Sequence, residues 1–167
     1  SDSENSDSWN EKDASAEVKF WWNKKYLYIG GVIKDDDPLH FDPLKHESGN
    51  AEMIFFYFSL DGPSRSRNFD EYDFRIDIAP SEEMGYVICK PLAEEKVIRT
   101  GKMITRKTLN GYRFEASIPL SDLTQWEPER EAMIGFNMEL VDYDGEPDKW
   151  TGKLIWTGSS HSVTNPE

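Results

Sequence analysis

The stretch Tyr72-Asp73-Phe74-Arg75-Ile76-Asp77-Ile78 alternates apolar and charged side chains along the sequence. Successive side chains of a β-strand point to opposite faces, so the stretch predicts a strand with its apolar residues on one face and its charges on the other. Helix signals are scarce: no apolar stripe of helical period persists for three turns, and Pro119–Leu123 supplies one turn at most. The pattern therefore favours a β fold.

A second stretch, Met53-Ile54-Phe55-Phe56-Tyr57-Phe58, is apolar on both faces and ends at Asp61-Gly62-Pro63, a turn signal. A strand of this kind is typical of the interior of a sheet. We therefore expect it to run through the middle of a sheet, with a layer packed on each side.

Two hairpins are predicted from turn residues. The Asn110-Gly111 step favours a tight hairpin turn, and the polar run Asn23-Lys24-Lys25 separates two apolar stretches. The strands joined in this way are Met103–Lys107 with Tyr112–Ile118 and Val18–Trp22 with Tyr26–Ile33, and further strands are expected at Gly85–Lys90, Ile134–Asp142 and Lys153–Trp156.

Eight or nine short strands with turn signals between them predict an all-β fold, a two-sheet antiparallel β-sandwich that is jelly-roll-like and immunoglobulin-like in outline. The 167 residues fit one domain. We divide the chain into a polar N-terminal tail or linker over residues 1–12 and a single β-sandwich domain over residues 13–167.

The chain carries 19 Lys and Arg against 32 Asp and Glu, a formal net charge of -13. The long-range field of such a chain repels polyanions, so nucleic acid and anionic membrane surfaces are poor partners. No stretch approaches the roughly 20 apolar residues that span a bilayer, and no membrane insertion is expected. Cys89 is the single cysteine, which excludes a disulfide within the chain.

The six tryptophans fall into two groups. Those in predicted strands are expected to pack in the core or at its edge, whereas those in polar, loop-like surroundings are better candidates for exposed platforms. The strand group is Trp21, Trp22 and Trp156, and the loop group is Trp9, Trp126 and Trp150.

With the strands placed, the order and spacing of several segments from Asp13 to Glu167 become informative. The chain resembles the family 9 carbohydrate-binding modules, a β-sandwich family found beside xylanases and other secreted glycan-active enzymes. The resemblance rests on residues 14–22, 26–29 and 33–38, on residues 51–56, on the Asp73-Phe74-Arg75 strand, and on residues 111–119, 134–139, Asp142 and Trp156.

The resemblance implies a site in which tryptophans clamp a sugar ring and polar groups take its hydroxyls. It places the carboxylate at Glu52 and the arginine at Arg75, with Asp73 and Asp77 as polar neighbours. At the two clamp positions the chain has His46 and Val163 in place of tryptophan, and we take Trp150 as the substitute ring. The alternative is that Arg75 simply pairs with Asp73, Asp77 or a cross-strand acid on a solvated sheet face.

Clustered acids suggest a metal site, because carboxylate oxygens are the ligands that calcium prefers, and the resemblance also implies structural calcium. The spacing differs from that of an EF-hand loop. No organic cofactor is expected. The predicted ligands are Asp35, Asp36, Asp37, Asp142 and Asp144.

The expected function is non-catalytic binding of a mono- or oligosaccharide, including the chain ends of plant-type glycans. The module would hold an attached enzyme or a cell surface against glycan, in an extracellular, periplasmic or cell-surface location and beside neighbouring domains of a larger secreted protein. No phosphate loop, nucleophile elbow or zinc pattern points to catalysis.

Two alternatives stay open. The first is a structural or protein-interaction module that keeps the fold and has lost the sugar. The second is a b-type haem electron-transfer domain that uses a Met and one of His40, His46 and His161. Compared with the family pattern, the chain begins after the first strand and ends before the last, so either the boundaries were trimmed or a neighbouring segment or a partner supplies those edge strands.

Overall fold

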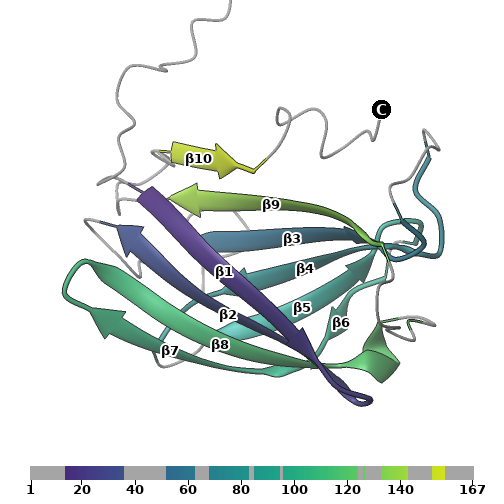
Figure 1. Cartoon of the computed structure of the whole chain (residues 1–167), viewed down its shortest axis with the longest axis horizontal. Helices are drawn as coiled ribbons and strands as arrows, with labels where there is room; N and C mark the ends of the chain where they lie inside the picture. The colour runs from purple at the N-terminus through teal and green to yellow at the C-terminus, as the bar shows by residue number, and fades with distance from the viewer. Residues whose placement is uncertain are drawn as a thin grey trace, which may run out of the picture.

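The computed structural model describes residues 14–35, 52–62, 68–82, 85–94, 96–123, 126, 133–142 and 152–156. These residues form two antiparallel sheets and one short 3-10 helix, η2, at Leu120–Asp122 (Figure 1). The two sheets face each other, which confirms the predicted β-sandwich. The strands are β1 (Ala14–Trp22), β2 (Tyr26–Asp35), β3 (Met53–Ser59), β4 (Asp73–Ala79), β5 (Tyr86–Pro91), β6 (Ile98–Arg99), β7 (Lys102–Thr108), β8 (Gly111–Pro119), β9 (Gly135–Asp142) and β10 (Gly152–Ile155).

The four-stranded sheet has the order β1-β2-β8-β7 and contains both predicted hairpins. The Asn23 carboxamide oxygen accepts hydrogen bonds from the backbone N–H groups of Lys25 and Tyr26, at 2.7 and 2.9 Å, and so fixes the β1–β2 turn. Gly111 follows the β7–β8 turn with φ 126°, a conformation that favours glycine. Strand β1 begins at Ala14, four residues before the predicted start.

The six-stranded sheet has the order β10-β9-β3-β4-β5-β6. Strand β3 lies inside this sheet between β9 and β4, as its apolar sequence predicts. Its Ile54, Phe56 and Phe58 face the interior, and all three are buried. A packed layer was also predicted on the other face of β3, and this prediction is wrong. Phe55 and Tyr57 on that face are only half-buried, and the charged side chain of Arg75 lies over their rings.

The core lies between the two sheets. Phe20 of β1 makes edge-to-face contacts with Phe56, Phe58 and Phe136 of the six-stranded sheet, with ring centroids 5.7, 5.8 and 5.1 Å apart. Burial of each such ring contributes roughly 1.5–3 kcal/mol, and aromatic pairs add to this. The ring of Phe20 thus joins the four-stranded sheet to β3 and β9 of the six-stranded sheet.

The tryptophans differ from the expectation. Trp21, Trp22 and Trp156 were expected to pack, but all are exposed, Trp156 to 69%. Trp126, a candidate for an exposed platform, is partly buried and packs against the core. Strand position alone does not bury a residue, because β1 is an edge strand whose outer face and last residue meet solvent.

In the part of the chain that the structure describes, no helix has the length and apolar character needed to cross a membrane.

Candidate functional site

Four polar side chains lie side by side on the outer face of the six-stranded sheet. Strand register puts Asn137 of β9 opposite Tyr57 of β3, Tyr57 opposite Arg75 of β4, and Arg75 opposite Lys90 of β5. The four therefore form one row across four adjacent strands. Asp77 lies two residues further along β4, on the same face.

Arg75 and Asp77 form the centre of this group. The Arg75 guanidinium donates two hydrogen bonds to the Asp77 carboxylate, Nε to Oδ1 at 2.5 Å and Nη2 to Oδ2 at 2.9 Å. Lys90 Nζ lies 2.6 Å from Oδ2 of the same carboxylate. The Asp77 side chain is 3% exposed and that of Arg75 is 26% exposed, so a nearly buried acid holds a partly exposed guanidinium.

Aromatic rings support the guanidinium from the sheet. The Arg75 Cζ atom lies 4.7 Å from the centroid of the Phe55 ring and 5.8 Å from that of Tyr57, within the range of cation–π attraction. The Tyr57 hydroxyl donates to Glu139 Oε2 over 3.4 Å. These contacts fix the Arg75 side chain before any ligand arrives.

The contacts of Arg75 favour its charged form. Burial acts against the charged form of Arg75, but the hydrogen bonds and charge of Asp77 outweigh it, and the pKa of Arg75 is raised. Burial raises the pKa of Tyr57, while Arg75 opposes that shift. A guanidinium has five N–H donors and two point at Asp77, so donors remain for a hydroxyl-bearing ligand.

Glu52 does not join this group. It directly precedes β3 and is buried at 1% exposure beside Tyr112 of β8, on the interior side of the sheet. Arg75 lies on the opposite, outer face of the same sheet, because its strand neighbours there are Tyr57 and Lys90. The predicted pairing of the Glu52 and Arg75 head groups in one hollow is therefore not what the fold produces.

Asp73 has a local structural contact. Its Oδ2 atom accepts a hydrogen bond from the backbone N–H of Asp70 at 2.9 Å, and its own N–H donates to the Asp70 carbonyl. The side chain is buried and closes the turn before β4. The predicted residues His46 and Trp150 lie outside the described residues.

Three buried acids gather at one end of the sandwich. Burial raises the pKa of the Tyr112 hydroxyl well above its ordinary value, and the charges of Glu52, Asp35 and Asp142 act in the same direction. Two predicted calcium ligands, Asp35 and Asp142, thus lie near the Tyr112 hydroxyl, and so does Glu52.

This donor set has the oxygen chemistry of a calcium site, although no group of three or more such side chains in the described residues has an arrangement that could hold a metal ion. A calcium site here needs further ligands. The other predicted ligands, Asp36, Asp37 and Asp144, lie outside the described residues.

Several residues of the outer-face group escaped the sequence analysis. Tyr57 and Phe55 belong to a stretch interpreted only as core, and Lys90 lies at the end of a strand with no charge pattern of its own. The Asn137-Met138-Glu139 alternation carried a usable signal, since it puts two polar side chains on one strand face. The missing information was strand order, which makes β9, β3, β4 and β5 neighbours.

Comparison with known proteins gives related domains. Residues 2–166 match the family model described as carbohydrate family 9 binding domain-like. The chain is 28% identical over 151 residues to endo-1,4-beta-xylanase C of Paenibacillus barcinonensis, a match that covers 88% of this chain and 12% of the xylanase.

Two solved structures share the fold. A carbohydrate-binding module of family 9 from Caldicellulosiruptor kristjanssonii, in complex with glucose, superposes with a TM-score of 0.67 at 14% identity, covering 91% of this chain and 71% of that one. Its complex with cellotriose gives the same TM-score and identity, with 91% and 70% covered. Because the family model matches nearly the whole chain, the chain belongs to the carbohydrate family 9 binding domain-like family.

Proposed function

We propose that this domain binds a mono- or oligosaccharide on the outer face of its six-stranded sheet, around Arg75, and catalyses no reaction on it. Membership of family 9 supports carbohydrate as the ligand. The observation that carries the location is the partly exposed guanidinium held by the buried Asp77 carboxylate above two aromatic rings.

The geometry suits hydroxyl recognition. A guanidinium fixed on two sides loses little side-chain entropy when its remaining N–H groups bind a ligand. Lys90 adds a second donor beside it, and Asn137 adds an amide group on β9, on the other side of β3. Vicinal hydroxyls of a sugar both donate and accept, so a mixed row of donors and acceptors matches them.

An aromatic platform completes such a site, because the CH face of a pyranose packs on a ring. In this chain we assign that part to Trp150, as a substitute for a missing clamp tryptophan, with His46, at the first clamp position of the family pattern, as the second ring. We keep Arg75 and Lys90 as the polar contacts, with Asp77 holding both of them in place, and assign Glu52 and Asp73 to structural roles.

Binding without chemistry has a clear use in a larger protein. The chain spans only 12% of the xylanase it matches, and holding a glycan near an attached enzyme raises its local concentration. We infer that the parent protein is extracellular or on a cell surface and that this domain attaches it to glycan.

Calorimetric titration with glucose and with cellotriose tests the proposal. We expect cellotriose to bind, and Arg75→Ala to weaken its affinity at least tenfold because the pre-organised donors are lost. Lys96→Ala removes an exposed cation between β5 and β6 and is the matched control. It should leave the affinity unchanged.

Two results contradict the proposal. The first is equal affinity of Arg75→Ala and the unmodified protein for cellotriose, with melting temperatures that show both are folded. The second is the absence of binding to either sugar and to a wider glycan array, which would favour the alternative of an interaction module that has lost its ligand.

We further propose a structural calcium ion near Asp35, Asp142 and Glu52. A cation that binds only the native state raises stability by mass action, by about 2.7 kcal/mol at a free concentration of 100 times the Kd. Chelator should therefore lower the melting temperature, and added calcium should restore it. Asp142→Asn should remove this response, and no response to chelator in the unmodified protein would disprove the metal.

A further inference from the structure

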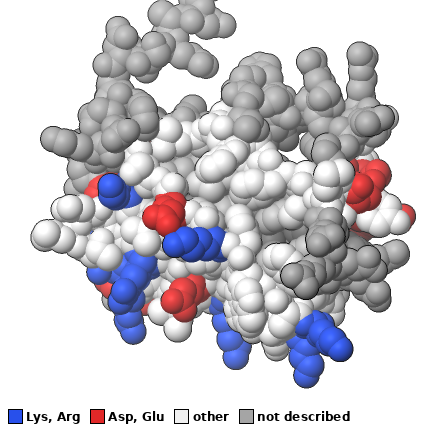
Figure 2. Space-filling model, viewed as in Figure 1, with Lys and Arg blue, Asp and Glu red and all other residues white. Residues whose placement is uncertain are grey.

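The four-stranded sheet has a charge opposite to that of the rest of the chain. Its segments, residues 14–35 and 102–119, contain 8 Lys and Arg and 3 Asp and Glu, a net charge of +5. The other residues contain 11 Lys and Arg and 29 Asp and Glu, a net charge of -18. Figure 2 shows basic side chains spread over this face, with acidic side chains among them. The overall acidity of the chain thus conceals a basic surface.

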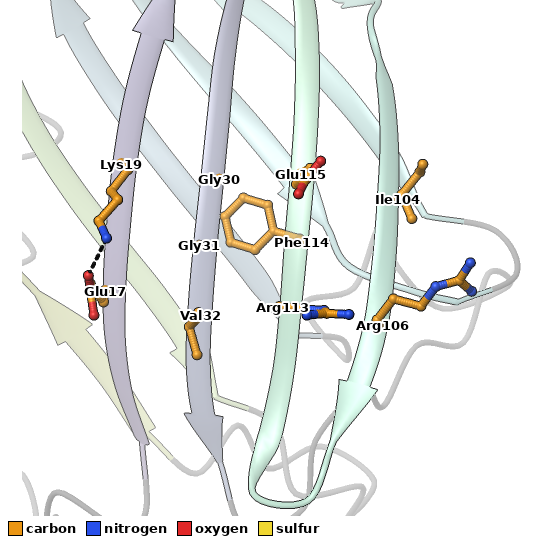
Figure 3. A pocket seen from close by; sticks show the side chains of 10 residues that line it. All are labelled: Glu17, Lys19, Gly30, Gly31, Val32, Ile104, Arg106, Arg113, Phe114 and Glu115. Atoms are coloured by element: carbon orange, nitrogen blue, oxygen red, sulfur yellow. Dashed lines mark ion pairs between the residues drawn. The ribbon is translucent and has the colours of Figure 1, made fainter.

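A hollow opens on the outer face of this sheet. Its volume is about 410 Å³, and it lies over Gly30 of β2, where no side chain covers the backbone (Figure 3). A Cβ atom at Gly30 would meet only the Phe114 carbonyl oxygen, at 3.8 Å, so the space above it is open. The hollow is lined by Glu17, Lys19, Gly30, Gly31, Val32, Ile104, Arg106, Arg113, Phe114 and Glu115.

Two arginines border this hollow without a carboxylate partner in the described part of the chain. Arg106 of β7 and Arg113 of β8 are directly opposite in register, and both are exposed. Like charges directly opposite on neighbouring strands repel, and an anion between them would relieve the repulsion. The nearby Lys19 differs, because it pairs with Glu17 at 2.9 Å.

An aromatic row continues from the hollow along the same face. Trp21 of β1 is 61% exposed, and its ring centroid lies 4.9 Å from that of Tyr28. Tyr26 lies 6.0 Å beyond Tyr28. Trp21 lies opposite Tyr28 on β2, and Lys19, which borders the hollow, lies opposite Gly30. The two pairs are two residues apart along the strands, so the aromatic row begins about 7 Å from the hollow.

From these features we propose that the outer face of the four-stranded sheet binds a glycan that carries carboxylates, such as a chain of uronic acid residues. The rings pack on the apolar faces of its sugars, and the Arg106 and Arg113 guanidinium groups match its carboxylates bidentately. The charge of -18 on the remaining residues repels long polyanions such as nucleic acid, so we expect the ligand to be a short acidic oligosaccharide with few carboxylates. This surface is separate from the Arg75 site and requires a different ligand.

The test uses oligogalacturonate and, as its matched neutral probe, the same oligosaccharide after reduction of its carboxyl groups. Titration should give binding of oligogalacturonate that is at least tenfold tighter than binding of the reduced form and that weakens as salt is added. Equal affinities for the two probes, or binding of neither, would overturn the proposal.

Two variants locate the binding. Gly30→Val fills the hollow without straining the backbone, and β-branched residues favour strands, so it should keep the melting temperature and lose at least tenfold in oligogalacturonate affinity. Arg106→Ala and Arg113→Ala, each made alone, should also lose affinity, and the two together at least tenfold, whereas Lys96→Ala, which matches the charge change of each single variant, should not. Unchanged affinity in both hollow variants would place the ligand elsewhere and contradict the proposal.

Analytical ultracentrifugation distinguishes the competing occupant, an acidic surface of a second copy. We expect a monomer at low salt, with the Arg106 and Arg113 variants unchanged in mass. A low-salt dimer that these variants dissociate would assign the basic face to self-association and would overturn the glycan proposal. Binding of cellotriose at Arg75 is unaffected by any of these outcomes, so the two proposals fail separately.

Discussion

The two outer faces of this sandwich hold their arginines in opposite ways. On the six-stranded sheet, Arg75 is largely buried, is bonded through two atoms to Asp77, and lies over the Phe55 ring. On the four-stranded sheet, Arg106 and Arg113 are exposed and directly opposite each other. The first arrangement fixes a side chain in advance, whereas the second leaves positive charge available.

The difference suggests two kinds of recognition. A pre-organised, internally neutralised arginine offers directional donors to hydroxyls, so it suits a neutral sugar. Exposed arginines that repel each other gain most from an anion. A single chain with a net charge of -13 can therefore carry both kinds of surface, because its charge is distributed unevenly between the sheets.

The largest expected change in stability comes from removing the Asp77 carboxylate on the six-stranded sheet. Asp77→Ala leaves Arg75 and Lys90 without the nearly buried carboxylate that both contact. Removing one partner of a buried pair costs about 3–5 kcal/mol, and the partial exposure of Arg75 puts the expected loss near the lower end, about 3 kcal/mol in the free energy of unfolding. Urea denaturation measures it. The control Lys90→Ala keeps the two hydrogen bonds between Arg75 and Asp77 and should lower the free energy of unfolding far less. Equal losses in the two variants would show that these hydrogen bonds are not the stabilising contact.

The second effect compares the two sides of β2. A Cβ atom at Gly31 points inward and collides with the Phe114 ring, whereas one at Gly30 points outward into open space. Gly31→Ala should cost about 1–3 kcal/mol of stability through overpacking. Gly30→Ala should be neutral or stabilising. If thermal melts show equal losses, the hollow over Gly30 is not open in solution.

The third effect concerns the interior that the two faces share. Burial, with the nearby charges of Asp122 and Asp77, raises the pKa of the Cys89 thiol from 9.0 to about 12. The folded state therefore retains a proton that the unfolded state releases, so this stability is present below pH 9 and is lost as the pH rises toward 12. The loss should approach 1.4 kcal/mol per pH unit at most. Urea titrations at pH 8 and pH 10.5 test it, and Cys89→Ala should flatten the difference.

The smallest change in stability is expected for the exposed arginines of the four-stranded sheet. Arg113→Ala removes an exposed cation that faces Arg106 across the strands. Surface changes of this kind usually alter stability by less than about 0.5 kcal/mol, and relief of the repulsion makes a slight gain the expected sign. A loss near that of Asp77→Ala would show that Arg113 has a structural partner after all, and the comparison of the two faces would fail.

Much of the fold could be predicted from the sequence because the alternation of β4 and β8 is regular and the turn residues at Asn23 and Asn110 act locally. The 3-10 turn at Leu120–Asp122 and the central position of β3 follow from the same kind of signal. The exposure of Trp21 and Trp22 could not be predicted, because it depends on β1 lying at the edge of a sheet, and strand order is a long-range property.

The candidate site was predictable only in part. The pairing of Arg75 with Asp77 was predicted as the alternative to sugar binding, and it forms because residues two apart on a strand share a face. Glu52 was grouped with them on the family resemblance, but its side chain points to the interior, where Tyr112 of the other sheet meets it. Without the strand register, the sequence does not show which face Glu52 takes at the start of β3. It also does not show that Tyr57 and Lys90 lie beside Arg75.

The central claim is that the outer face around Arg75 receives the sugar. Its most direct test is the ¹H–¹⁵N spectrum of the Arg75 Nε–H group, with the backbone amides of β3, β4 and β5, during titration with cellotriose. The account predicts saturable shifts of the Arg75 Nε–H signal and of amides near Tyr57 and Lys90. Saturable shifts confined to other parts of the molecule, with the Arg75 signal unchanged at saturation, would contradict it.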